Sequence, residues 1–152
     1  MSVDQAFNYK KISDSISTAG LLNEEQLNVL GTEGYEVVIN LLPQESEYAI
    51  QSESSIVAAQ GIHYEYIPVD FASPLESDYQ NFSEVISAHS GKKLMVHCAA
   101  NYRVSAFYAI YAFNKLGWSK PQVYDFISAI WDLGEHPVWE EFVSTMVNAK
   151  NG

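Results

Sequence analysis

The chain has 152 residues, of which 47% are hydrophobic and 13% aromatic, so it has the size of one domain that can bury a sizeable core. Eight basic residues stand against nineteen acidic ones, and the formal net charge of −11 repels nucleic acid and anionic membrane surfaces. We therefore expect no nucleic-acid and no membrane partner. The same charge disfavours highly charged ligands, so an anion site must depend on local hydrogen-bond donors.

No internal repeat, low-complexity tract or linker divides the chain, and we expect a single domain over residues 1–152. No apolar run approaches the roughly 18 residues that a membrane span needs. The first residues lack the basic and apolar regions of a signal peptide. Cytoplasm is the default expectation, unless an export signal has been removed.

The first half of the chain alternates helix and strand patterns. Asn23 with Gln26 three positions later predicts a capped helix that ends at Gly31 or Gly34. Residues 35–42 are nearly uncharged and stopped by a proline, which is typical of a central strand buried on both faces. Residues 46–60 are compatible with a helix, and 62–69 form a second strand candidate.

A turn over 70–72 separates that strand from the best-marked helix start in the chain. There, Ser73 is the expected N-cap, Pro74 the first helical residue and Glu76 the partner in a capping box. Residues 93–97 form a third short strand that runs straight into Cys98.

The last third of the chain is helical. Apolar residues cover nearly every face of 104–117, which predicts a buried helix. A capping box at Ser119 and Gln122 begins the next helix, and 138–147 gives a last amphipathic one. The alternation of strands and helices predicts the α/β class, with a short, mostly parallel sheet flanked by helices in three layers.

The junction between the third strand and the buried helix carries the candidate site. Ligands of parallel sheets bind beyond the carboxyl ends of the strands, where Cys98 lies. The positive end of the helix favours the thiolate of Cys98, and Arg103 can hold an oxyanion through two hydrogen bonds. We expect a phosphate or sulfate to be bound by the backbone N–H groups of Ala99, Ala100, Asn101, Tyr102, Arg103, Val104 and Ser105. The alternative is that Cys98, the one cysteine of the chain, is a small buried hydrophobe.

The order of strand, His-Cys, small polar loop, Arg, Ser and buried helix resembles the protein tyrosine and dual-specificity phosphatases. Their signature is His-Cys, five residues, Arg, then Ser or Thr. The segments 16–20, 37–41 and 66–70 occur in the order seen in a little-characterised bacterial branch of that superfamily. The resemblance covers roughly residues 10–120. It implies a dual-specificity-phosphatase-like fold, no metal or other cofactor, and a phosphorylated small molecule or phosphoprotein as substrate.

The resemblance also implies roles for individual residues. Cys98 would be the nucleophile that forms a phosphocysteine, and Arg103 would clamp the phosphate. Asp70 would be the general acid, on a strand-to-helix loop that could swing over the site. His97 would orient the cysteine, and the Ser105 hydroxyl would ease departure of the thiolate. The alternative for Asp70 is an ordinary turn residue.

The loop departs from the phosphatase pattern in its length. Only four residues separate Cys98 from Arg103, so either the arginine comes one step early, with Val104 in its place, or the loop has lost a residue. Asn101 replaces the flexible glycine and is the residue type next most tolerant of positive φ. A Cys-x4-Arg loop also has the length found in rhodanese-like sulfurtransferases, and a phosphate-binding module without turnover is the third alternative.

The remaining histidines give no metal signal in the sequence. His63, His89 and His136 share no metal-ligand spacing with one another or with Cys98, so the sequence predicts no zinc site.

Overall fold

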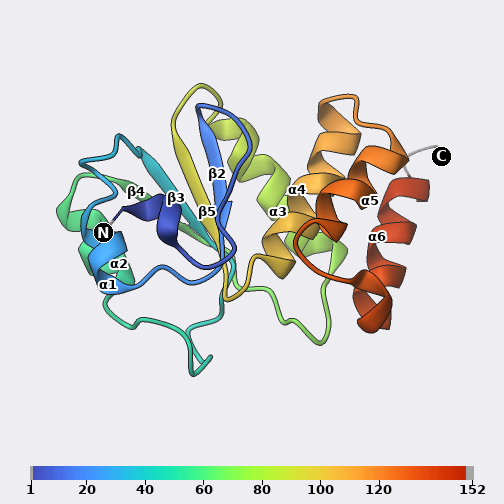
Figure 1. The fold of residues 1–152 in the computed structure, drawn as a ribbon, viewed down its shortest axis with the longest axis horizontal. Helices are drawn as coiled ribbons and strands as arrows, with labels where there is room; N and C mark the ends of the chain where they lie inside the picture. Colours follow the sequence, from blue (N-terminus) through green and yellow to red (C-terminus); the bar gives the residue numbers. More distant parts are fainter. Residues whose placement is uncertain (1, 150–152) are drawn as a thin grey trace.

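The computed structural model describes residues 2–149 and contains a five-stranded sheet in the order β1-β2-β5-β3-β4 (Figure 1). The strands are β1 (Lys10–Lys11), β2 (Ile16–Ala19), β3 (Val37–Asn40), β4 (His63–Tyr66) and β5 (Leu94–His97). The β1–β2 pair is antiparallel, and every other pair is parallel. The predicted α/β class with a short, mostly parallel sheet is confirmed.

The two innermost strands carry the buried apolar pattern that the sequence predicts. Every residue of β3 and of β5 is buried, and β5 lies between β2 and β3. The register pairs Val38 with Met95 and Asn40 with His97, so these two strands end at the same edge of the sheet. Residues that follow β5 therefore emerge at the carboxyl edge, beside those that follow β2 and β3.

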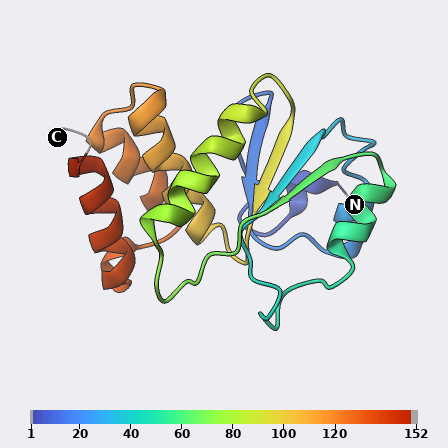
Figure 2. The same cartoon turned by 180° about the vertical axis from the view of Figure 1, so that it is seen from behind.

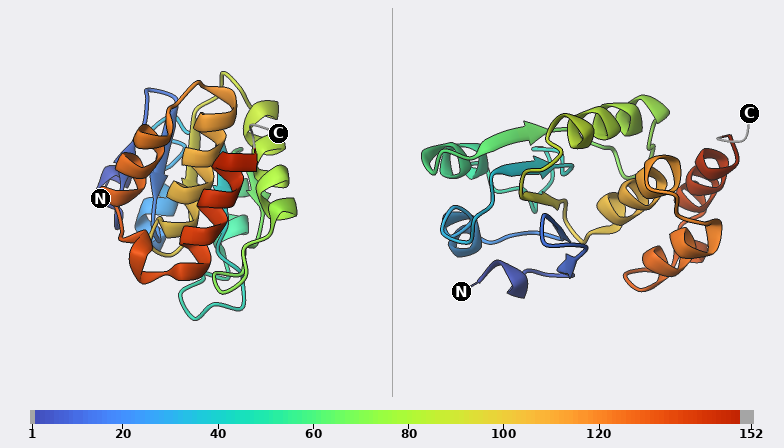
Figure 3. Two further views of the ribbon diagram at one scale, coloured as in Figure 1. Left: turned by 90° about the vertical axis from the view of Figure 1, so that its right-hand side faces the viewer. Right: turned by 90° about the horizontal axis from the view of Figure 1, so that it is seen from above.

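Helices cover both faces of the sheet, as three layers require (Figure 2). One face packs against the short helices η1 (Val3–Gln5), α1 (Glu24–Asn28) and α2 (Glu53–Ala59). The other face packs against α3 (Glu76–Ala88) and α4 (Tyr102–Lys115). Helices α5 (Lys120–Ser128) and α6 (Pro137–Ala149), joined through η2 (Leu133–Glu135), pack against α4 (Figure 3).

Two of the predicted helix starts are confirmed by their hydrogen bonds. Asn23 accepts from the Gln26 N–H, and the Gln26 side chain accepts from the Asn23 N–H. Ser119 and Gln122 form the same reciprocal pair at the start of α5. Both caps depend only on residues three positions apart, which is why the sequence was sufficient to find them.

The helix predicted to begin at Ser73 begins two residues later. The Ser73 N–H donates to Asp70 O in the preceding turn, and Leu75 is extended, with φ −117° and ψ 148°. The N-cap is therefore Leu75, whose N–H donates to Asp78 at 3.2 Å. Only residues 53–59 of the helix-compatible segment 46–60 are helical in α2.

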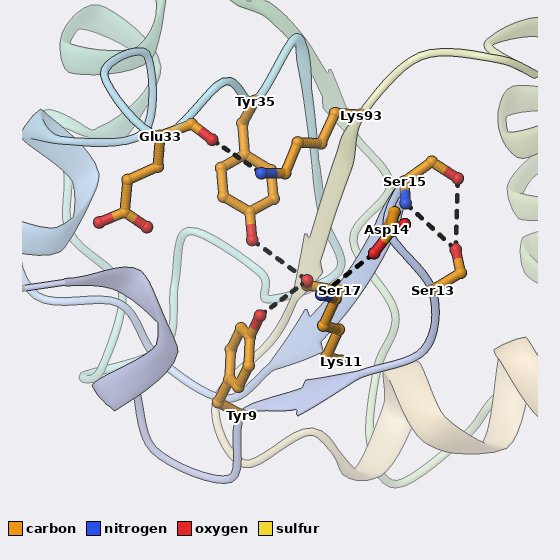
Figure 4. A network of polar contacts seen from close by, with 9 residues as sticks. All are labelled: Tyr9, Lys11, Ser13, Asp14, Ser15, Ser17, Glu33, Tyr35 and Lys93. Atoms are coloured by element: carbon orange, nitrogen blue, oxygen red, sulfur yellow. Dashed lines mark hydrogen bonds and ion pairs between the residues drawn. The ribbon is translucent and has the colours of Figure 1, made fainter.

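A polar network fixes the N-terminal segment to the sheet (Figure 4). The Tyr35 hydroxyl donates to Ser17 on β2 at 3.1 Å, and Ser17 is also hydrogen-bonded to the Tyr9 hydroxyl at 3.0 Å. Burial raises the pKa of Tyr35, so this hydroxyl stays protonated and keeps donating. The Lys93 ammonium lies 4.5 Å from the centre of the Tyr35 ring. Tyr9 is thereby held against β2.

Within residues 2–149, no helix is both long and apolar enough to cross a membrane.

Candidate active site

Cys98 lies at the carboxyl edge of the sheet, directly after β5 and just before the N-terminus of α4. This is the placement that the sequence predicts. The side chain of Cys98 is fully buried and belongs to the core on the α4 side of the sheet. The helix, however, begins at Tyr102 rather than at residue 104, so Arg103 lies in its first turn.

The carbonyl groups of the loop point toward the N-terminal segment. The Ala99 oxygen accepts from the Leu21 N–H at 2.9 Å, and the Ala100 oxygen accepts from the Asn8 side chain at 2.9 Å. In a trans peptide the C=O of one residue and the N–H of the next point in opposite directions. The N–H groups of Ala100 and Asn101 therefore point away from that segment.

The peptides on either side are oriented in the same manner. The Cys98 oxygen faces the His97 ring at 3.2 Å from Nδ1, so the next N–H, that of residue 99, points away from His97. The Asn101 oxygen accepts from the Ser105 N–H at 3.0 Å, so the Tyr102 N–H points out of the helix end.

The result is a run of donors without acceptors. Among residues 2–149, no protein group accepts a hydrogen bond from the N–H groups of 99–104. Unpaired backbone donors at the positive end of a helix are the recognised arrangement for binding an oxyanion. The Ser105 N–H, which we expected among these donors, is bonded to Asn101 instead, because α4 starts earlier than predicted.

Asn101 holds the loop in this shape. Its backbone is left-handed, with φ 67°, the conformation expected for the residue that replaces the glycine. Its side-chain amide donates to Asn8 O and to Thr18 Oγ1, both at 2.9 Å. Asn8 donates back to Ala100, so two asparagines from distant parts of the chain bind each other's backbone.

Gly20 allows the loop to approach the end of β2. A Cβ atom on Gly20 would lie 2.7 Å from Ala99 O, 2.9 Å from Ala100 Cα and 2.9 Å from Phe7 O. All three are backbone atoms, which cannot move aside independently. The segment 16–20, one of those that carry the family resemblance, therefore ends in a glycine that packing requires.

Arg103 links the loop of residues 99–104 to the loop that carries Asp70. Its Nε donates to Val69 O at 2.9 Å, and its guanidinium lies 5.2 Å from the centre of the Phe71 ring. The two terminal nitrogens of the guanidinium form no hydrogen bond with any group in residues 2–149, so their N–H groups remain for a ligand. Val104 is fully buried in the core and cannot occupy the arginine position.

Asp70 is exposed, and the backbone carbonyls of the residues before and after it both accept hydrogen bonds. Arg103 binds the carbonyl before it, and the Trp139 indole donates to the carbonyl of Phe71, after it, at 2.7 Å. Asp70 Oδ1 accepts from the Ala72 N–H at 3.0 Å, as in an ordinary Asx turn. The loop that we expected to swing is thus tied to helices α4 and α6 in this structure.

The Ser105 hydroxyl already forms two hydrogen bonds within the protein. It donates to Tyr102 O at 3.1 Å and accepts from the Trp131 indole at 2.9 Å. The Trp131 ring also stacks on the Tyr102 ring, with centroids 4.4 Å apart and planes 6° from parallel. Ser105 therefore fixes the first turn of α4, and its proton points at Tyr102 O.

Behind the loop lies a buried ion pair that the sequence analysis did not identify. The His97 Nε2 lies 2.5 Å from a carboxylate oxygen of Glu53, the first residue of α2, and both side chains are almost completely buried. Burial alone would lower the pKa of His97, but the adjacent Glu53 carboxylate and the Cys98 carbonyl outweigh it, and the pKa is raised. His97 Nδ1 contacts the Cys98 carbonyl at 3.2 Å and so helps to hold that peptide.

A cavity of about 560 Å³ opens beside the loop at the same edge of the sheet. Its lining contains no charged side chain, and two of its aromatic residues, Phe7 and Tyr48, are among the most exposed apolar side chains in the described chain. The lining residues are Gln5, Phe7, Leu21, Asn23, Gln26, Tyr48, Ala99 and Ala100.

The chain is similar in sequence and fold to a candidate phosphatase of the DUF442 family from Shewanella putrefaciens CN-32. One structure of that protein is 33% identical, with a TM-score of 0.86, and the match covers 95% of this chain and 91% of that one. The catalytic core of the S. cerevisiae PP-IP phosphatase Siw14 has a similar fold at 13% identity, with a TM-score of 0.77 over 91% of this chain and 85% of that one.

Among curated proteins, the chain is similar to the beta-lactamase hydrolase-like protein of Xylella fastidiosa. The two are 26% identical over 102 residues, which is 65% of this chain. The match spans 23% of that protein, so the matched part of this chain corresponds to about a quarter of its relative's length. No protein-family model matches the sequence.

Replacing Gly20 with alanine should distort the loop, because the new methyl group meets the Ala99 carbonyl. We expect the free energy of unfolding to fall by about 1–3 kcal/mol, as for other overpacked sites, and phosphate to stabilise the variant less than the wild type. Thermal unfolding with and without phosphate measures both effects. Gly31→Ala is the matched control, because its methyl group meets only the flexible side chain of Gln60. Unchanged stabilisation by phosphate in Gly20→Ala would contradict the packing requirement.

Replacing Glu53 with glutamine should change how stability depends on pH. Because the pKa of His97 is raised in the folded protein, its contribution to stability is complete below about pH 6.5 and is lost as the pH rises through the raised value. Glu53→Gln removes the charge that raises the pKa of His97 and leaves burial opposed only by the Cys98 carbonyl, so the loss of stability with rising pH should shrink or reverse. Melting temperatures from pH 5 to 9 test the sign, with the exposed Glu84→Gln as control. Parallel curves for wild type and Glu53→Gln would exclude the charged pair.

Proposed function

Because this chain belongs to the DUF442 family, within the protein tyrosine and dual-specificity phosphatase superfamily, we propose that it hydrolyses a phosphomonoester through a phosphocysteine on Cys98. The run of unpaired N–H groups from Ala99 to Val104 is the observation that supports this proposal best. A tetrahedral phosphate offers several oxygens to such donors, and the positive end of α4 adds to the attraction. The guanidinium of Arg103 contributes the two terminal nitrogens that remain free.

The proposed reaction has two steps, and in each step one bond to phosphorus forms and one breaks. The Cys98 thiolate attacks phosphorus, the P–S bond forms, and the ester P–O bond breaks while the Asp70 carboxylic acid gives its proton to the leaving oxygen. Water then attacks the phosphocysteine with the Asp70 carboxylate as base, and this step releases phosphate and the thiolate. The Glu53–His97 pair positions the Cys98 carbonyl. It thereby orients the N–H group of Ala99, which belongs to the same peptide and is the first of the donors.

The cavity beside the loop, which Ala99 and Ala100 line, supports a proposal for the kind of ester. Its aromatic and amide lining contains no cation, and the chain carries a formal net charge of −11, so a substrate with several phosphates is disfavoured. Among proteins of this fold, TpbA of P. aeruginosa has been crystallised with phosphotyrosine. We propose a substrate with one phosphate on an uncharged, aromatic group, carried by a small molecule or a protein.

A binding module without turnover is the second candidate, and two observations favour it. Cys98 is fully buried, and the Ser105 hydroxyl is committed to Tyr102 O rather than free to assist a leaving thiolate. Such a protein would hold the phosphate on the same donors without attacking it.

Kinetics on an aryl phosphate separate these functions. The wild type should turn over, Cys98→Ser should be inactive, and Arg103→Ala should lose about 10²–10³ in kcat/KM, as for removal of one charge-stabilising donor. Arg103→Lys keeps the charge but lacks the planar pair of donors, so it should lose nearly as much. Lys92→Ala, which removes an exposed cation, is the control. Wild type and Cys98→Ser that bind phosphate but are equally inert would establish the binding module instead.

Two further comparisons complete the assay. Asp70→Asn should slow esters with poor leaving groups and spare those with good ones, because a good leaving group needs no proton. Uniform slowing would assign Asp70 a structural role through its turn. Thiocyanate formation from thiosulfate and cyanide, lost in Cys98→Ser, would point to the sulfurtransferase class and contradict the phosphatase.

A further inference from the structure

The fold brings together three side chains that offer metal-ligand atoms at a place remote from Cys98. His63 Nε2 lies 2.6 Å from Glu65 Oε2, and His89 Nε2 lies 3.1 Å from the same oxygen. The two imidazole rings have centroids 4.8 Å apart. All three ligand atoms lie within 4.8 Å of one another.

The cluster is built by the sheet edge and the end of a helix. His63 and Glu65 are two positions apart on β4, so their side chains project from the same face of this edge strand. His89 is the C-cap residue of α3, the helix that packs over that face. The His89 side chain is 12% exposed, the Glu65 side chain 29% and the His63 side chain 54%, so two ligands are held by packing and the third faces solvent.

The cluster is separate from the candidate active site. Strand β4 is divided from β5 by β3, and the register places His63 level with Val37 and Leu94, at the start of those strands. Cys98 follows the opposite end of β5. Metal chemistry at the cluster would therefore not involve the phosphate-binding loop.

The donor set is that of a transition metal. Two imidazole nitrogens and one carboxylate oxygen are the ligands of many zinc sites in which water completes a tetrahedron. Ligand atoms about 2.0–2.1 Å from such an ion lie roughly 3.3 Å apart, so the cluster needs only small side-chain rotations, which the exposed His63 can supply. Mg²⁺ and Ca²⁺ prefer oxygen ligands and fit this set poorly.

We propose that His63, Glu65 and His89 bind one Zn²⁺ or a similar divalent transition metal, with an open position for water. The ion ties the edge strand β4 to the C-terminal end of α3, which the Glu65–His89 hydrogen bond and the contact between the His63 and His89 rings already bring together. Metal binding consequently stabilises the folded chain, because the unfolded chain does not hold the three ligands together.

Titration with Zn²⁺ and with Co²⁺ tests the site in a Cys98→Ser background, which excludes binding by the thiol. We expect one equivalent to bind, tetrahedral Co²⁺ absorption to appear, and the melting temperature to rise. His63→Ala should weaken binding by at least about tenfold and abolish the rise, and Glu65→Gln should weaken binding similarly. His63 is exposed and belongs to neither buried core cluster, so its replacement should leave the core unchanged. His89→Ala is informative only if its circular dichroism matches that of the parent.

His136→Ala is the matched control, because it removes a histidine outside the cluster and should bind like the parent. Equal affinity in the parent, His63→Ala and Glu65→Gln would overturn the proposal. No binding of Zn²⁺ or Co²⁺ at sub-millimolar concentration would also overturn it. A response to Mg²⁺ equal to that to Zn²⁺ would contradict the assigned donor chemistry.

Discussion

The turn from β5 into α4 leaves the N–H groups of residues 99–104 without an acceptor anywhere in residues 2–149, and an unpaired backbone donor of this kind costs free energy comparable to a lost hydrogen bond. While these N–H groups stay unpaired, the carbonyl groups of the same peptides are held by hydrogen bonds. Each carbonyl from Cys98 to Asn101 faces a hydrogen-bond donor of the protein, so the donors cannot rotate to find partners of their own. We propose that an oxyanion is the partner of these donors.

Residues that are distant in the sequence hold this turn in place. Gly20 lets the loop lie against the end of β2, and Asn8 and Asn101 bind one another across 93 positions of the sequence. The Glu53–His97 pair is buried behind the loop, and His97 Nδ1 contacts the Cys98 carbonyl. Because the chain carries a formal net charge of −11, the oxyanion binding that we propose depends on these local donors rather than on long-range attraction.

The sequence was sufficient for features that depend on neighbouring residues. The buried strand before Cys98, the buried helix after it and the caps at Asn23 and Ser119 are periodic or short-range patterns, and all are in the structure. The start of α4 was placed two residues late, because a left-handed Asn101 caps it without a side-chain hydrogen bond to recognise.

Other parts of the site could not be predicted, since tertiary contacts create them. Glu53 lies in a segment with other carboxylates, and nothing local marks it as the buried one. His89 meets Glu65 from 24 positions away, which no motif spacing indicates. The bond of Arg103 to Val69 and that of Trp139 to Phe71 depend on how α4 and α6 pack, which the sequence pattern does not specify.

The central claim is that the free N–H groups of the loop bind an oxyanion, and amide chemical shifts during titration of ¹⁵N-labelled protein with inorganic phosphate test it most directly. The account predicts saturable shifts in the amide resonances of residues 99–104, while that of Ser105, already bonded to Asn101, moves much less. Shifts that leave the loop unchanged, or that occur equally at unrelated lysines, would contradict it.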